Sequence, residues 1–85
     1  MKINKSYHIL KRDNEFFITN IENGDVYLIN DVTLCIFEKC DSVNTVDELT
    51  ELIYKMFQNS NETYSKQDLK AFILELISNN FILIT

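Results

Sequence analysis

The chain has 85 residues, a formal net charge of −5 and 46% apolar residues, with one glycine and no proline. This length allows one hydrophobic core, so we expect a single domain spanning residues 1–85, built without metal or disulfide support. The acidic charge balance argues against nucleic-acid binding, which requires clustered Lys and Arg side chains.

The first third of the sequence predicts three antiparallel strands. Short β-prone runs occupy residues 7–10, 16–21 and 26–29. Asp13-Asn14 can form the turn between the first two runs. Between the second and third runs, Asn23-Gly24 favours the positive φ angles of a two-residue hairpin loop. We therefore expect a three-stranded meander whose outer strands each have an unpaired edge.

After the third strand, the spacing of apolar residues changes from that of a strand to that of a helix. Asn30 can cap a largely buried first helix that runs from about Asp31 to Cys40. A second helix is expected to start at Thr45, where Thr45-Val46-Asp47-Glu48 forms a capping box, and to end at residues 59–61.

A third helix is predicted from the cap Ser65 to Asn79-Asn80, because Asn can adopt the left-handed conformation that ends a helix. The short apolar run at residues 81–84 follows it. The order of elements predicts an α+β fold, in which a three-stranded antiparallel sheet is followed by three helices packed on one side of it.

The residue types that carry chemistry do not form a catalytic or metal-binding pattern. His8 is the only histidine and has no nearby cysteine or paired carboxylate. Cys35 and Cys40 are expected to be reduced, buried thiols, since no second pair completes a zinc site. The carboxylates are spread over loops and polar helix faces. We therefore expect no enzyme activity, no metal and no cofactor.

The apolar runs are too short to span a bilayer, and the first residues lack the apolar stretch of a signal peptide. The sequence therefore predicts a cytoplasmic protein that does not enter a membrane.

The third helix carries two stripes of residues at helical spacing. Leu69, Phe72 and Leu76 form one stripe, which we expect to meet the core. The second stripe consists of Lys66, Lys70, Ile73, Leu74 and Ile77. Its apolar members either pack under the sheet or the C-terminal residues, or line a groove beside an open strand edge, where an extended peptide could bind by strand addition.

From Gly24 onward, the sequence resembles the PqqD-like family, the peptide chaperones of pyrroloquinoline quinone biosynthesis and the related recognition elements of ribosomally made, modified peptides. The segments that carry the resemblance are Tyr27-Leu28-Ile29-Asn30, Val32 to Phe37, Cys40-Asp41-Ser42, Thr45-Val46-Asp47-Glu48-Leu49, and Asp68-Leu69 with Phe72-Ile73 and Leu76. The sequence departs from the family pattern at Ser42 and at Asn79-Asn80, where many members have Gly.

The resemblance implies a winged helix-turn-helix-like domain that binds the leader of a precursor peptide along its third strand, in the cleft formed with the third helix. The peptide-binding residues that it implies are Asp25, Val26, Tyr27, Leu28 and Ile29 of the strand, and Lys66, Lys70, Ile73, Leu74 and Ile77 of the helix. The alternation along the strand does not decide whether Val26 and Leu28 or Tyr27 and Ile29 face the groove, because both sets are apolar.

The resemblance also implies a second partner, which is a separate modifying enzyme. This enzyme is a leader peptidase in lasso-peptide biosynthesis and a radical-SAM enzyme in other classes, and the small size of the chain slightly favours the lasso type. Two alternatives stay open. One is a winged-helix DNA-binding regulator, and the other is a structural subunit that dimerises through its strand edge.

Overall fold

The computed structural model describes residues 1–58 and 64–84. The elements, in chain order, are β1 (Lys2–Ile3), β2 (Tyr7–Arg12), β3 (Glu15–Asn20), β4 (Val26–Ile29), α1 (Asp31–Lys39), the 3-10 helix η1 (Cys40–Ser42), α2 (Val46–Met56), α3 (Lys66–Ser78) and β5 (Ile82–Leu83). The expected α+β fold, with a three-stranded antiparallel sheet and three α-helices, is confirmed.

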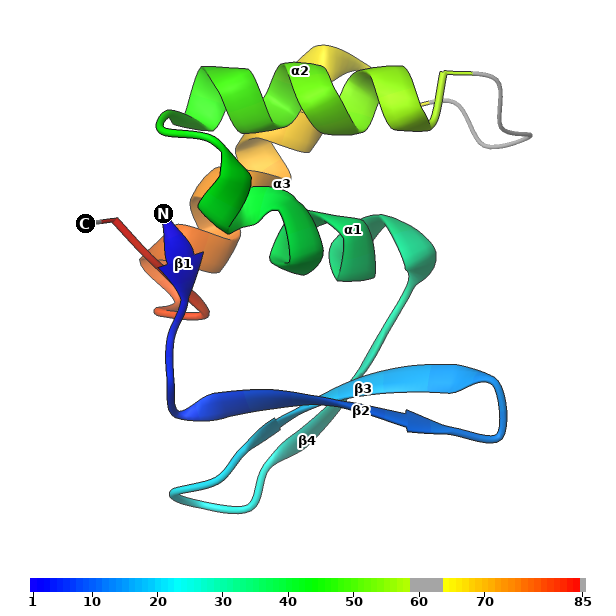
Figure 1. Ribbon diagram of the computed structural model, residues 1–85, viewed down its shortest axis with the longest axis vertical. Helices are drawn as coiled ribbons and strands as arrows, with labels where there is room; N and C mark the ends of the chain where they lie inside the picture. Colours follow the sequence, from blue (N-terminus) through cyan, green and yellow to red (C-terminus); the bar gives the residue numbers. More distant parts are fainter. Residues whose placement is uncertain (59–63, 85) are drawn as a thin grey trace.

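The helices lie on one side of the sheet formed by β2, β3 and β4 (Figure 1). In this view α1 lies between the sheet and α2, and α3 crosses behind α1 and ends near β1 and β5. The opposite face of the sheet is covered by none of the described helices. The molecule therefore has a covered and an uncovered sheet face.

The predicted N-cap hydrogen bonds are present, although the Glu48 carboxylate accepts from the Thr45 hydroxyl and not from the Thr45 amide that a capping box would use. The Asn30 side chain accepts a hydrogen bond from the Thr33 amide at the start of α1. The Thr45 and Ser65 hydroxyls accept from the Glu48 and Asp68 amides at the starts of α2 and α3. Each bond satisfies an amide that has no partner within its helix, which fixes where the helix begins.

The ends of the helices follow the prediction in part. Asn80 takes a positive φ of 64° immediately beyond the end of α3, as expected. The α-helix α1 ends at Lys39, and the 3-10 helix η1 follows it directly. In α2, the last helical residue is Met56 and Phe57 is the cap, whereas the predicted end at residues 59–61 lies outside the described residues.

The tight two-residue loop of the sheet connects β2 to β3, and not β3 to β4 as the sequence predicts. Asp13 and Asn14 both have positive φ and connect paired Arg12 and Glu15, which is the two-residue loop of a tight hairpin. Between β3 and β4 the predicted two-residue loop at Asn23-Gly24 is wrong. That loop spans residues 21–25.

Local side-chain bonds explain the longer loop. The Asn20 side chain accepts from the Glu22 amide, and the Asn23 side chain accepts from the Asp25 amide. Each of these bonds closes a short turn, in which an Asn side chain accepts from the amide two residues further on. Gly24, within the second turn, has a positive φ. The wider loop still returns β4 antiparallel to β3.

A second, two-stranded sheet joins the chain ends. Lys2 pairs with Leu83, and Ile3 pairs with Ile82, so β1 and β5 are antiparallel neighbours (Figure 1). Ile82 is fully buried. The apolar C-terminal run therefore closes the core as a strand, which the sequence analysis does not predict.

The core lies mainly between the helices. Its buried apolar residues are Ile18, Val32, Ile36, Phe37, Cys40, Leu49, Ile53, Leu69, Ile73, Leu76 and Ile82. The sheet contributes Ile18, with Ile9 and Tyr27 beside it in register on the neighbouring strands. Because side chains alternate along a strand, this register assigns each β4 residue to one face of the sheet.

Candidate functional site

Strand β4 is an outer strand of its sheet, so one of its edges is unpaired among the described residues. Its sequence is Val-Tyr-Leu-Ile, with no charge and no proline. Val26 is 58% exposed, Tyr27 44% and Leu28 64%. Proteins usually protect such edges with charges, prolines or bulges, because an open apolar edge pairs with other chains. This edge is suited to accept an extended peptide.

The ladder between β3 and β4 determines which backbone groups reach the open edge. The Asn20 amide donates to the Asp25 carbonyl, so this pair is hydrogen-bonded across the loop end of the ladder. Hydrogen-bonded and non-bonded pairs alternate along antiparallel strands. It follows that Tyr27 and Ile29 bond to β3, while the amides and carbonyls of Val26 and Leu28 point to the open edge.

The register also resolves which side chains of β4 face the helices. Tyr27 lies opposite buried Ile18, and Ile29 opposite Phe16, on the covered face. Val26 and Leu28 therefore point to the uncovered face. Of the two alternatives that the sequence leaves open, the one that directs Tyr27 and Ile29 toward the helices is the one found in the structure.

A hollow of about 180 Å³ lies where the end of β4 leads into α1 and meets α3. Asn30 and Val32 line it from the β4–α1 side, and Asp68, Leu69 and Phe72 line it from α3, together with Tyr64. Its lining is mostly apolar, with the Asp68 carboxylate and the Asn30 amide as polar groups. The side of α3 that faces the β4–α1 junction is thus the side of Asp68 and Phe72.

The helix residues that the sequence predicts for the site lie on different sides of α3. Lys66 forms an ion pair with Glu51 at 2.9 Å, and Lys70 forms one with Asp47 at 2.9 Å, so both lysines face α2. The side-chain hydrogen bond from Lys66 lowers the pKa of Glu51. In Figure 1, α2 lies on the far side of the helical layer from the sheet, so the structure does not bring the two lysines next to β4, as the sequence led us to expect.

The apolar members of the same stripe do not form one surface either. Ile73 is 0% exposed and belongs to the core, whereas Leu74 is 46% exposed and Ile77 is half-buried. Leu74 follows Phe72 by two residues, which places the two side chains about 200° apart around the helix. Leu74 therefore points away from the hollow beside β4.

Phe72 is not among the site residues predicted from the sequence, because its spacing places it in the stripe that faces the core. Phe72 packs against the core yet stays half-buried and lines the hollow. Phe72 lies at the margin of that stripe, and Asp68 lies one turn earlier on the same side of the helix. This polar neighbour was the signal in the sequence that Phe72 lies at the edge of the core.

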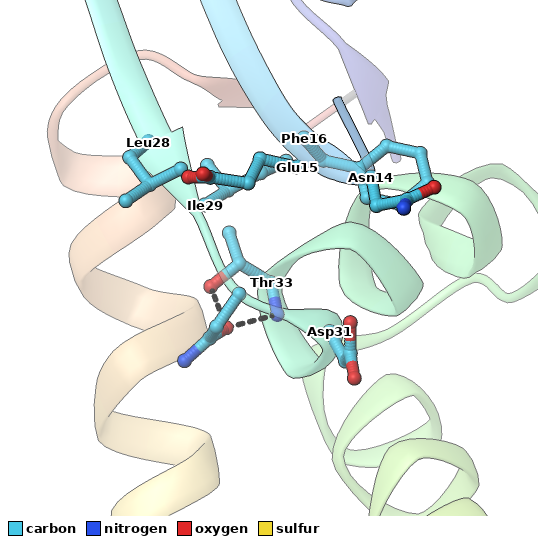
Figure 2. Close-up of a pocket in the computed structure, with 8 residues that line it drawn as sticks. Asn14, Glu15, Phe16, Leu28, Ile29, Asp31 and Thr33 are labelled. Atoms are coloured by element: carbon cyan, nitrogen blue, oxygen red, sulfur yellow. Dashed lines mark hydrogen bonds between the residues drawn. The ribbon is translucent and has the colours of Figure 1, made fainter. Parts of the chain in front are cut away.

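A larger hollow of about 400 Å³ lies on the other side of the β4–α1 junction (Figure 2). Its lining residues are Asn14, Glu15, Phe16, Leu28, Ile29, Asn30, Asp31 and Thr33. The Asn30 side chain accepts from both the amide and the hydroxyl of Thr33, at 2.8 and 2.7 Å. This residue caps α1 and fixes the point at which the chain leaves the sheet, so it separates the two hollows.

Asp25 lies at the loop end of the edge strand. The Tyr27 hydroxyl donates to its carboxylate at 3.3 Å. The negative charge of Asp25 raises the pKa of Tyr27. Tyr27 presents its ring to the covered side of the edge, with its hydroxyl bonded to Asp25.

The described residues contain no group of three or more His, Cys, Asp and Glu side chains placed to hold a metal ion. Among the same residues, no helix has the length and apolar character needed to cross a bilayer. His8 is exposed on β2.

Comparison of the chain with known proteins finds no matching family model, no matching curated protein and no matching solved structure.

Proposed function

We propose that this protein is a peptide-binding module that captures the leader of a ribosomally made precursor peptide as an added strand on β4 and presents it to a separate modifying enzyme. The observation that carries the proposal is the open edge of β4, which combines exposed apolar side chains with free backbone groups at Val26 and Leu28. Backbone bonds supply affinity in this mode of recognition, and side-chain pockets supply selectivity.

The hollow between the β4–α1 junction and α3 is the selective part of the proposed site. An inward-facing peptide side chain beside Ile29 would reach Val32 and Phe72. The resemblance to the PqqD-like family supports the same location, since it implies binding between the third strand and the third helix. In this proposal the partners are a leader peptide and a leader peptidase or a radical-SAM enzyme, and the chain itself carries out no chemistry.

The ion pairs of α3 count against the DNA-binding alternative. A recognition helix needs basic side chains directed at phosphates or bases. The basic residues of α3 are Lys66 and Lys70, and both are paired with carboxylates of α2. Random duplex DNA should therefore give no salt-sensitive complex, and a mobility shift that weakens as salt rises would favour the alternative.

A proline at the open edge tests the proposal. In Val26→Pro, the lost amide is one that faces the edge, and proline is tolerated at the first residue of an edge strand. The variant should fold but should bind a leader peptide encoded beside its gene more than about tenfold more weakly, from an affinity of roughly micromolar. Fluorescence anisotropy with the labelled leader measures this change.

Lys11→Pro is the matched control. Hydrogen-bonded and non-bonded pairs alternate between β2 and β3 as well, so the Lys11 amide points to the other open edge of the sheet, which β2 forms. It should bind like the wild type. Hydrogen exchange gives a second readout, in which the leader slows exchange at the Val26 and Leu28 amides. Wild-type affinity in Val26→Pro, or protection confined to another surface, would reject the proposed site.

A further inference from the structure

We propose that the peptide bound at β4 carries large apolar side chains on both faces of its strand, and that its outward-facing side chains pack on the sheet face that the helices leave uncovered. This inference rests on the proposed strand addition. The expected ligand is a peptide segment with apolar residues at adjacent positions, and not only at every second position.

The uncovered face carries an apolar row across all strands of the sheet. The register aligns Leu10 of β2, Phe17 of β3 and Leu28 of β4 on this face. Leu10 is 49% exposed, Leu28 is 64% exposed, and Phe17 is half-buried. Beside the row, a hollow of about 410 Å³ is lined by Leu10, Phe17 and Val26 together with Lys11 and Arg12.

An added strand would extend this row by one member. Side chains directly opposite each other on neighbouring strands have Cβ atoms about 5 Å apart and stabilise the pairing when both are apolar. The ligand residue opposite Leu28 would therefore lie next to Leu28 on the uncovered face. The next ligand residue would point to the other side, beside Tyr27 or Ile29. Both sets of ligand side chains thus meet apolar surface.

The continuity of this face with the edge identifies the occupant. Val26 and Leu28 supply both the backbone groups at the open edge and the exposed side chains on the uncovered face. A peptide that bonds to these backbone groups necessarily lies against these side chains. A second copy of the chain is a weaker candidate, because each copy carries a net charge of −5 and the two copies repel each other.

Selection from a library of random linear peptides displayed on their encoding mRNA tests the inference. The bait is the immobilised full chain, and peptides that also bind Val26→Pro are removed first. The remaining peptides should carry apolar residues at adjacent positions. In Leu28→Thr, which replaces the apolar side chain by a β-branched polar residue that strands accommodate well, these peptides should bind about tenfold more weakly or worse.

Ile21→Thr is the matched control, because Ile21 is 58% exposed but lies in the β3–β4 loop, outside the row. This variant should bind the selected peptides like the wild type. Circular dichroism spectra and melting curves should show that both threonine variants are folded at the temperature of the binding experiment.

The outcomes separate the inference from the proposed function. If the selected peptides are apolar only at alternate positions, or bind Leu28→Thr with unchanged affinity, strand addition stands and the inference is overturned. If no peptide distinguishes the wild type from Val26→Pro, both are overturned. Sedimentation equilibrium that detects a dimer dissociated by Leu28→Thr would assign the face to a second copy and overturn the inference.

Discussion

Tyr27 of β4 and Phe81, which follows α3, meet edge to face with their ring centroids 5.7 Å apart. Phe81 also contacts Tyr7 of β2 at 4.6 Å and Phe37 of α1 at 6.4 Å between centroids. One aromatic side chain therefore joins the sheet, the first helix and the end of the third. These contacts hold β4 at a fixed distance from the helices on its covered face.

Removing that ring should loosen the whole sheet. We expect Phe81→Ala to lower the free energy of unfolding by about 2 kcal/mol, since a partly buried ring and its aromatic contacts are lost. Urea denaturation followed by circular dichroism measures the change. Ile84→Ala is the control, because Ile84 is 67% exposed in the same C-terminal run and should change stability little. Equal effects of the two substitutions would contradict the proposed role of Phe81.

The hairpin turn at Asp13-Asn14 gives a second test of stability. Asn14 has a φ of 66°, a conformation that Ala adopts at a cost of about 1 kcal/mol and Gly adopts freely. Asn14→Ala should lower the free energy of unfolding by about that amount, whereas Asn14→Gly should not lower it. Thermal melts of the two variants measure the difference. An alanine variant as stable as the glycine variant would disprove the left-handed turn.

The starts of the helices could be predicted from sequence because local chemistry determines them. Asn30, Thr45 and Ser65 each cap a helix by accepting a hydrogen bond from the amide three residues further along the chain, and that bond needs no tertiary contact. The three strands could be predicted for the same reason, from short β-prone runs separated by turn residues.

The pairing of the chain ends and the orientation of α3 could not be predicted from such local signals. Ile3 and Ile82 are far apart in the sequence, and a two-residue strand has no pattern of its own. For α3, apolar and long charged side chains lie all around the helix. Which of Phe72 and Leu74 faces the sheet depends on how the buried side chains Leu69, Ile73 and Leu76 pack into the core, and this is a tertiary property.

The two thiols should react slowly in the folded protein. The prediction that both thiols are buried is wrong for Cys35, which is half-buried. This partial burial raises the pKa of Cys35, and the carboxylates of Glu38 and Asp31 raise it further. Burial is also the main cause of the raised pKa of Cys40, whose side chain is 1% exposed. The thiolate is the reactive form, so a raised pKa lowers its population at neutral pH.

Alkylation with iodoacetamide near neutral pH, followed by mass spectrometry, should therefore modify Cys35 slowly and Cys40 more slowly still. Both should react readily in urea. Because the fold favours the protonated thiols, their contribution to stability is complete below their ordinary pKa of 9.0 and is lost as pH rises through the raised values. Native alkylation of Cys40 as fast as that of the unfolded chain would contradict its placement in the core.

A peptide bound at β4 should contact the side of α3 that carries Phe72. Phe72 lines the hollow beside the β4–α1 junction, and Leu74 points to another side of the same helix. Phe72→Ala should weaken binding of the leader peptide by about tenfold, because an inward-facing peptide side chain loses its apolar partner. Leu74→Ala should leave the affinity unchanged.

Melting curves must accompany the titrations, since Phe72 also packs against the core and its truncation should lower the free energy of unfolding by about 2 kcal/mol. Binding is therefore measured well below the melting temperature of each variant, where both are folded. Heteronuclear NMR spectra of the two variants then show whether β4 is intact. A folded Phe72→Ala with wild-type affinity, or a loss of affinity in Leu74→Ala, would move the peptide to the opposite side of α3 and would restore the stripe of Lys66, Lys70 and Leu74 as the binding face.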